Sequence, residues 1–216
     1  EIRAVMSGAG TVILTESMDI GTTGGSDFHE DGVYTIVADG RDIWDNWDEF
    51  HYVYAVAKGD FEISAHVLSL ENTHQWAKAG VMVRETLNPE SRNAFMLVTP
   101  EQGEGRFSFQ SRSSGTGELS SSFRTIQGQV SYPNNTWVKI KRQGNTFTGF
   151  ISEDGIAWEV LPGHYPLPTD NSGSNPMTIE MPEKVYVGLA VTSHSPGVLC
   201  TAHFDNVVLP TGESYN

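Results

Sequence analysis

The 216-residue sequence predicts an all-β protein, an antiparallel β-sandwich with little or no helix. Short runs in which apolar and polar residues alternate recur along the chain, which is typical of strands with one buried face. Turn-forming residues separate these runs, and the 22 glycines and 10 prolines are spread along the chain rather than gathered in a linker. No segment of helical period reaches the length of an ordinary helix, so we expect no helices between the strands.

Length, charge and cysteine content exclude several classes of protein. A β-sandwich of this size can bury a core as one domain without staples, and the single Cys200 excludes an intramolecular disulfide. The formal net charge is −14, from 27 acidic and 13 basic side chains. Nucleic acids and anionic membrane surfaces require a basic face, so we expect neither as a partner. No apolar run is long enough to span a bilayer, so membrane insertion is not expected.

The first half of the chain contains a lead-in and the start of the sandwich. Residues 1–18 are predicted to form a first strand or a lead-in, and residues 19–216 a single β-sandwich domain. A Lys-Gly-Asp turn at residues 58–60 joins strands at 50–56 and 61–67, and apolar residues alternate with polar ones in the second. Further strands are expected over residues 32–38, 76–86 and 93–98.

The second half repeats this pattern of strands and turns. Residues 137–142 and 146–152 flank a Gln-Gly-Asn turn and form the clearest hairpin. Residues 161–182 are rich in proline and form the longest irregular stretch, which is either a rim or an edge covering. The remaining strands are predicted over residues 106–112, 185–194 and 200–209.

The strand over residues 76–86 has two unlike faces. The apolar face comprises Ala77, Ala79, Val81 and Val83. The opposite face, with two cations and an indole, comprises Trp76, Lys78, Gly80, Met82 and Arg84. Unpaired buried charge is costly, so this face must either pair its cations or open onto a wet groove. The strand therefore indicates a site.

Face parity predicts which residues of other strands gather beside this one. If the strands share a sheet, Arg112 and His194 fall on the same face as the two cations, opposite the apolar residues of each strand. A polar sheet face rimmed by indoles suits sugars, because sugar rings stack on aromatic faces and hydroxyls meet fixed donors and acceptors. The predicted ligand-binding residues are Trp44, His51, Trp76, Lys78, Arg84, Arg112 and His194.

The basic residues gather on this face although the chain as a whole is acidic. Arginine recognises carboxylate and sulfate groups through paired hydrogen bonds, so an anionic glycan is an attractive ligand. The alternative is that the cations are paired within the protein, for example with Glu62 or Glu85, on a solvated face. The sequence leaves both alternatives open.

Metal binding is only weakly indicated. Asp19 and Asp205 can meet if the first and last strands pair, which would give an oxygen site for a structural calcium ion. No cofactor is expected to be required. No two histidines have the spacing of zinc ligands, so zinc is not expected.

Catalytic residues are not assigned from the sequence. We find no pair of carboxylates on one strand face, as a retaining glycosidase would require. Lyase chemistry stays open, because it needs a cation beside a uronate carboxylate and a base. The groups that can supply these parts are Lys78, Arg84, Arg112, Tyr186 and His194.

A series of motifs follows in order along the chain. It comprises Asp42-Ile-Trp44, Asp48-Glu-Phe-His51, Gly59-Asp60-Phe-Glu, Trp76-Ala-Lys-Ala-Gly-Val-Met-Val-Arg84, Phe109-Gln-Ser-Arg112, Ser152-Glu-Asp-Gly-Ile-Ala-Trp158, Val187-Gly-Leu-Ala-Val-Thr-Ser-His194 and Phe204-Asp-Asn-Val207. Over residues 19–209 the series resembles a poorly characterised bacterial family of concanavalin A-like (laminin-G-like) jelly-roll modules. The resemblance implies a jelly-roll sandwich within a larger secreted or surface protein, often beside hydrolase, lyase or adhesion domains. It implies no catalytic mechanism.

These observations lead to one primary hypothesis and two alternatives. The primary hypothesis is a lectin-like carbohydrate-binding module, extracellular or on a bacterial cell surface, that binds a polysaccharide or oligosaccharide, anionic chains included, on a concave sheet face. The first alternative is a polysaccharide lyase or glycoside hydrolase using the same groove, which predicts new unsaturated or reducing ends. The second is a structural or adhesin interaction domain whose polar face is internally paired.

Overall fold

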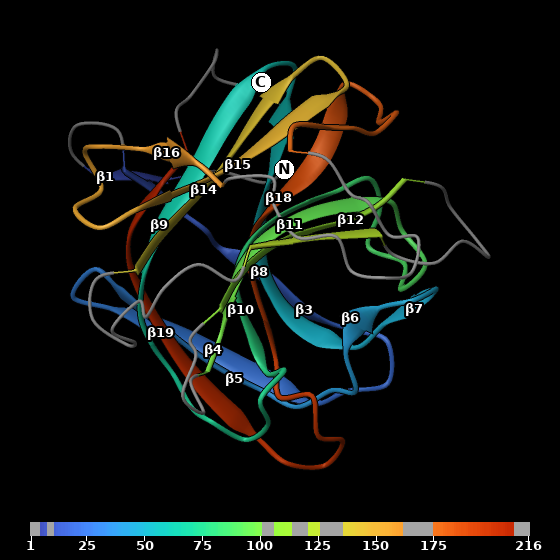
Figure 1. Ribbon diagram of the computed structural model, residues 1–216. Coiled ribbons are helices and arrows are strands. Elements are labelled where there is room, and N and C mark those ends of the chain that lie inside the picture. The colour runs from blue at the N-terminus through green and yellow to red at the C-terminus, as the bar shows by residue number, and fades with distance from the viewer. Residues whose placement is uncertain are drawn as a thin grey trace.

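A computed structural model of the chain describes residues 5–7, 11–100, 106–113, 121–125, 136–161 and 175–209. Within these residues there are strands and no helix, and two antiparallel sheets pack against each other (Figure 1). This confirms the predicted antiparallel β-sandwich. The strands are β1 (Val5–Ser7), β2 (Thr11–Ile13), β3 (Glu16–Ile20), β4 (Gly25–Glu30), β5 (Val33–Ala38), β6 (Ile43–Trp44), β7 (Trp47–Asp48), β8 (Phe50–Lys58), β9 (Phe61–Leu70), β10 (Lys78–Arg84), β11 (Asn93–Thr99), β12 (Arg106–Arg112), β13 (Ser121–Thr125), β14 (Thr136–Gln143), β15 (Thr146–Ser152), β16 (Glu159–Val160), β17 (Met177–Thr178), β18 (Lys184–Thr192) and β19 (Cys200–Val208).

The two sheets differ in size. The seven-stranded sheet has the order β13-β12-β11-β10-β18-β8-β3. The ten-stranded sheet follows β1-β2-β19-β9-β14-β15-β16, with β4, β5 and β17 joined beside this path, and β6 and β7 form a separate hairpin. The chain crosses from one sheet to the other between β8 and β9, β9 and β10, and β18 and β19, so consecutive strands face each other across the core as in a jelly roll.

The main core lies between the sheets and follows the alternation predicted from the sequence. Val81 of β10 lies beside Leu189 of β18 and Met96 of β11, and all three side chains are fully buried. The predicted apolar face of this strand is buried in full: Ala77, Ala79, Val81 and Val83. Burying one large apolar side chain stabilises the fold by about 1.5–3 kcal/mol relative to leaving it exposed. The free Cys200 is buried in the same core.

The outer face of the seven-stranded sheet, on the side away from this core, is also largely apolar. Register places Met82 beside Phe95 on this face. A second buried cluster forms here from Ile20, Ile43, Phe50, Tyr52, Tyr54, Met82, Phe95, Leu97 and Ala190. Because Ile43 comes from β6, the β6–β7 hairpin packs over the sheet. The face is therefore more apolar and more covered than the sequence predicted.

Residues before position 19 contribute to both sheets. β2 meets β19 at Thr11 and Val208, whereas β3 pairs with β8 from Glu16 onward. No helix in the described ranges is long and apolar enough to cross a membrane.

Candidate functional site

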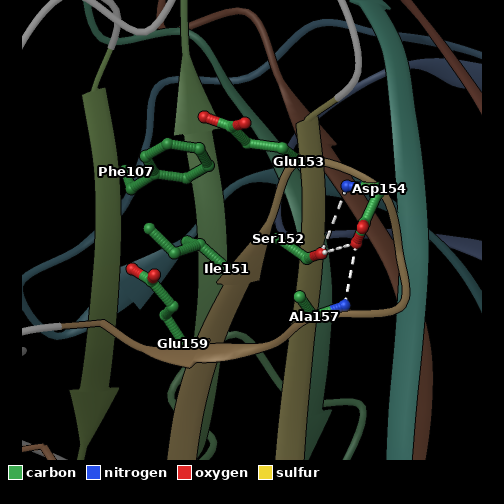
Figure 2. Close-up of a pocket in the computed structure, with 7 residues that line it drawn as sticks. All are labelled: Phe107, Ile151, Ser152, Glu153, Asp154, Ala157 and Glu159. Atoms are coloured by element: carbon green, nitrogen blue, oxygen red, sulfur yellow. Dashed lines mark hydrogen bonds between the residues drawn. The ribbon is translucent and has the colours of Figure 1, made fainter.

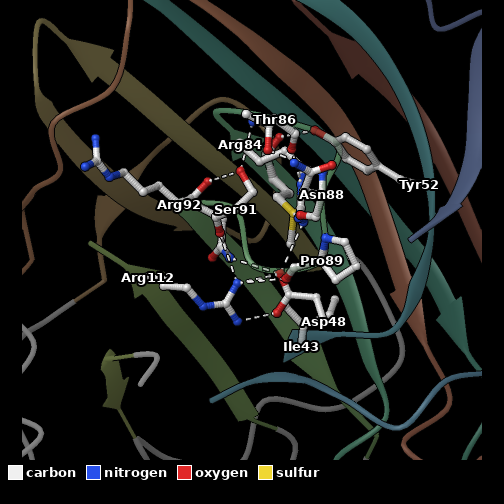
Figure 3. A network of polar contacts seen from close by, with 12 residues as sticks. Ile43, Asp48, Tyr52, Arg84, Thr86, Asn88, Pro89, Ser91, Arg92 and Arg112 are labelled. Atoms are coloured by element: carbon white, nitrogen blue, oxygen red, sulfur yellow. Dashed lines mark hydrogen bonds and ion pairs between the residues drawn. The ribbon is translucent and has the colours of Figure 1, made fainter. Parts of the chain in front are cut away.

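A buried ion network lies on the outer face of the seven-stranded sheet (Figure 3). The Asp48 carboxylate accepts hydrogen bonds from both terminal nitrogens of Arg112, at 2.6 and 2.9 Å. It also accepts one from Nη1 of Arg84 and one from Nδ2 of Asn93, each at 3.3 Å. Both arginines and the aspartate have no exposed side-chain surface. One aspartate thus pairs with two arginines in the interior.

Backbone carbonyl groups accept further hydrogen bonds from these guanidinium groups. Arg84 donates to the carbonyls of Thr86 and Asn88, at 2.8 and 2.5 Å. Arg112 donates to the carbonyls of Trp44, Asp45, Pro89 and Ser91. Burial lowers the pKa of Arg84, although the nearby Asp48 opposes this effect. The network attaches the β6–β7 hairpin and the loop after β10 to the sheet, and its donors do not face solvent.

This arrangement differs from the predicted role of Arg84 and Arg112 as ligand-binding residues. Both arginines are paired within the protein, which is the alternative that the sequence left open. The partner is Asp48, because Glu62 and Glu85 pair instead with Lys139 and Arg92. Asp48 lies 36 and 64 positions from the two arginines, so no local spacing indicated it. The lyase hypothesis thereby loses the two arginines proposed to neutralise a uronate.

A second polar cluster lies at the opposite end of β10, around Lys78. Lys78 Nζ lies 2.5 Å from Asp42 Oδ1 and donates to the Ile43 carbonyl at 3.0 Å. His194 Nδ1 lies 3.3 Å from the other Asp42 oxygen, and the His194 ring stacks on His74 with centroids 4.3 Å apart. With the two neighbouring indoles, we define the Lys78 cluster as Asp42, Trp44, His74, Trp76, Lys78 and His194.

The rings of the Lys78 cluster are reachable from solvent, whereas its charge pair is sheltered. The Trp44 ring centroid lies 5.6 Å from Lys78 Nζ, and the Trp76 backbone N–H donates to His74 Nδ1 at 3.1 Å. Both indoles and both imidazoles are partly exposed. The Lys78 side chain is only 4% exposed and Asp42 21%. A ligand would therefore meet aromatic faces first, with the polar groups at their edges.

Local geometry holds His194 and Asp42 in this arrangement. His194 has φ = 56°, in the left-handed region that non-glycine residues rarely adopt and that recurs at functional sites. The turn is fixed by Ser193 Oγ, which accepts a hydrogen bond from the Ser195 N–H at 3.1 Å and donates to the Gly40 carbonyl at 3.3 Å. Burial raises the pKa of Asp42, but its contacts with His194 and Lys78 outweigh burial and lower it, so the carboxylate stays charged.

The structure brings together four of the seven predicted ligand-binding residues: Trp44, Trp76, Lys78 and His194. His51 lies on the other face of the sheet, because its register partner Val191 faces the main core. Its two ring nitrogens lie 2.7 and 2.9 Å from Asp19 and Asp27. Sequence reasoning did not assign Asp42 or His74 to the site. The only available signal was that each lies two positions before an assigned indole.

Asp19 and Asp205 do not form the predicted pair. Asp19 lies on β3, which pairs with β8, and its carboxylate contacts His51. Asp205 lies on β19 in the other sheet and contacts His66 Nδ1 at 2.8 Å. The strands that carry them are not neighbours, since β19 pairs with β2, β5 and β9. Among the residues that the structure describes, no group of three or more His, Cys, Asp or Glu side chains is placed to hold a metal ion.

A small cavity of about 220 Å³ opens beside β15 and β16 (Figure 2). Its lining residues are Phe107, Ile151, Ser152, Glu153, Asp154, Ala157 and Glu159. The Asp154 carboxylate accepts hydrogen bonds from two backbone N–H groups of its own turn, each at 2.8 Å, and these bonds lower its pKa. The lining residues include no histidine, cysteine or cation, so we assign no chemistry to this cavity.

No protein-family model and no curated protein matches the sequence. A functionally unknown protein from Saccharomyces cerevisiae is similar in structure, with a TM-score of 0.64 and 16% identity over 88% of this chain and 93% of its own. The κ-carrageenase from Pseudoalteromonas carrageenovora, solved with an oligotetrasaccharide of κ-carrageenan, has a TM-score of 0.48 and 6% identity over 85% of this chain and 81% of its own. The CBM2 module of an evolved Dit from Lactobacillus casei BL23 phage J-1 has a TM-score of 0.45 and 11% identity over 88% and 82%. The fold is shared. At these identities the similarity shows no function.

Proposed function

We propose that this protein is a carbohydrate-binding module that holds a glycan at the Lys78 cluster. The observation that carries the proposal is the grouping of three partly exposed rings, from Trp44, His74 and His194, around one sheltered charge pair, with the partly exposed Trp76 bonded to His74 through its backbone N–H. Sugar rings pack on aromatic faces, and their hydroxyl groups need fixed donors and acceptors. The imidazoles and the Lys78–Asp42 pair supply both kinds of group.

The pairing of charges favours a neutral glycan. The Lys78 ammonium is neutralised by Asp42 at 2.5 Å. Arg84 and Arg112 are enclosed with Asp48 and have no exposed side-chain surface. A uronate or sulfate group would have to displace one of these internal carboxylates to reach a cation, which leaves a buried charge without its partner. We therefore propose an uncharged polysaccharide or oligosaccharide as the ligand, in place of the anionic chain that the sequence suggested.

Affinity electrophoresis tests this proposal. Wild type, Trp44→Ala and Trp158→Ala are run through gels that contain laminarin, xyloglucan, alginate or κ-carrageenan. Trp158 is a matched control, because its partly exposed ring also lies over a lysine, 4.3 Å from Lys139 Nζ, but on the ten-stranded sheet. We expect a neutral polysaccharide to retard wild type and Trp158→Ala, and the Trp44→Ala variant to bind about tenfold more weakly or not at all.

Two results would contradict the proposal. If Trp44→Ala is retarded as strongly as wild type, a glycan is bound elsewhere on the molecule. If no polysaccharide retards any of the three proteins, the structural or adhesin interaction domain becomes the preferred function, because the internal pairing of both arginines favours it. We also propose an extracellular or cell-surface location within a larger chain, which the resemblance of the motif series supports.

A further inference from the structure

Trp47 lies outside the Lys78 cluster but is paired with one of its members, Trp44, in the β6–β7 hairpin. Its side chain is 47% exposed, although indoles are usually largely buried. Trp47 is the cross-strand partner of Trp44 in the β6–β7 hairpin, with only Asp45 and Asn46 between them. Directly opposed residues of an antiparallel pair lie on the same face of the ribbon. The hairpin, at the right-hand edge of Figure 1, therefore presents two neighbouring indoles, one of which belongs to the Lys78 cluster.

Polar contacts on both sides of the hairpin turn hold these indoles in place. Before and within the turn, Arg112 donates to the carbonyls of Trp44 and Asp45, at 3.4 and 2.9 Å. After the turn, the Asp48 carboxylate is held by the same guanidinium group, and the Asp48 N–H donates to the Pro89 carbonyl at 3.0 Å. Figure 3 shows Asp48 between Arg112 and Pro89. The backbone on either side of Trp47 is thus attached to the sheet.

The turn after β3 supports the hairpin from another direction. A Cβ atom at Gly21 would lie 2.4 Å from the Asp48 carbonyl oxygen and 3.3 Å from Trp47 Nε1. Only a glycine allows this close approach, and Gly21 has φ = 77°. The hairpin is therefore fixed between this turn and the guanidinium group of Arg112.

The energetics of the ion network suggest why such a support is present. Burying charges carries a desolvation penalty that offsets most of their attraction, so a buried ion group is weak evidence for stability on its own. The contacts of Arg112 instead fix the position of a turn that bears two aromatic rings. Rings that are fixed before binding lose less conformational freedom when a ligand arrives, which favours affinity.

We propose, resting on the carbohydrate-binding function above, that Trp44 and Trp47 form two consecutive stacking subsites for one glycan chain. Arg112 is a positioning residue that acts through the hairpin and does not touch the glycan. The ligand class is then a neutral chain recognised along its length over at least two adjacent sugar rings, rather than a single terminal sugar.

A ladder of oligosaccharides tests this proposal. Binding of wild type, Trp47→Ala, Trp47→Phe and Phe28→Ala is titrated with cello-, xylo-, manno- and laminari-oligosaccharides, from the monosaccharide to the hexasaccharide. Phe28 is the control, because it is 56% exposed on β4 of the ten-stranded sheet. Trp47→Ala should bind the disaccharide and longer members about tenfold more weakly and the monosaccharide as wild type does, and Trp47→Phe should recover part of the loss. Phe28→Ala should match wild type at every length.

The positioning role of Arg112 is tested in the same ladder. Arg112→Lys keeps the charge but loses the paired contacts of the guanidinium group, which hold the backbone of both indoles. Among the fraction that folds we therefore expect weaker binding at every length, with a larger loss for the longer members than for the monosaccharide. If Trp47→Ala loses binding equally at all lengths, or loses none, the two-subsite proposal is overturned. The proposed function still holds in that case, provided that binding is lost in Trp44→Ala. If wild type binds none of the oligosaccharides and no polysaccharide, the proposed function fails and this proposal fails with it.

Discussion

The two ion clusters on β10 use the same kinds of charge and differ in burial. At one end Asp48 joins Arg84 and Arg112 with no exposed side-chain surface. At the other end Asp42 joins Lys78, and Asp42 remains 21% exposed beside partly exposed rings. The first cluster attaches a hairpin, and the second can be reached by a ligand. The two clusters therefore differ in their access to solvent and not in the type of charge that they contain.

The largest expected effect comes from removing the aspartate of the buried network. Asp48→Ala leaves two arginines in the interior without their carboxylate, so we expect a loss of about 3–5 kcal/mol in the free energy of unfolding. Asp42→Ala should cost about 1–2 kcal/mol, because Asp42 is 21% exposed and water can enter the space that it leaves and hydrate Lys78. Urea unfolding of both variants measures the difference. Equal losses in the two variants would remove the distinction between the clusters.

On the other face of the seven-stranded sheet, His51 of β8 contacts Asp19 of β3 and Asp27 of β4, and we call these three residues the His51 junction. Burial lowers the pKa of His51, but its hydrogen bonds to Asp27 and Asp19 outweigh burial and raise the pKa above the usual 6.5. The hydrogen bond to His51 lowers the pKa of Asp27 below the usual 3.8. The histidine contributes stability that is fully present below pH 6.5 and is lost as the pH rises through its raised pKa. The aspartate contributes stability that is present above pH 3.8 and is lost as the pH falls through its lowered pKa.

These two pH ranges overlap, so the His51 junction should contribute most to the stability of the fold in mildly acidic solution. We expect His51→Gln to lose about 1.5 kcal/mol relative to wild type at about pH 5.5, since it removes hydrogen bonds to charged groups, and less at about pH 9. Urea unfolding at both pH values provides the measurement. The Phe28→Ala variant, altered on the neighbouring β4, controls for general effects of pH. A constant difference between His51→Gln and wild type would show that the charge of His51 does not hold β3, β4 and β8 together.

The fold was predictable because its signals are local. Strand periodicity places Val81 and Val83 on one face whatever the partner strands are, and both are buried as predicted. The hairpin of β14 and β15 likewise follows from a short turn between two alternating runs. Such patterns need only neighbouring residues, so one sequence is enough to interpret them.

The site was only partly predictable because its pairings are long-range. Face parity correctly placed Lys78, Arg84 and Arg112 on one side of the sheet, but it contains no information about what covers that side. The cover is the β6–β7 hairpin, and its aspartate Asp48 decides whether the arginines face solvent. His51 was grouped with them, although Val53 lies two positions further along the strand and therefore on the same face, which is apolar. Parity should have carried more weight there than residue type.

The smallest effect on stability, and the sharpest separation of the clusters, is expected for His194→Gly. A histidine held at φ = 56° costs about 1 kcal/mol, which glycine removes, but glycine loses a similar amount through the greater freedom of the unfolded chain. The free energy of unfolding measured in urea should therefore change by less than about 0.5 kcal/mol. Binding to the neutral polysaccharide, measured by retardation, should weaken about tenfold because the imidazole is removed. Asp48→Ala should show the opposite result, with a large loss in the free energy of unfolding and a smaller effect on retardation of the folded protein. If His194→Gly instead unfolds as readily as Asp48→Ala, the Lys78 cluster is a structural element like the buried network, and the glycan must be sought elsewhere on the sandwich.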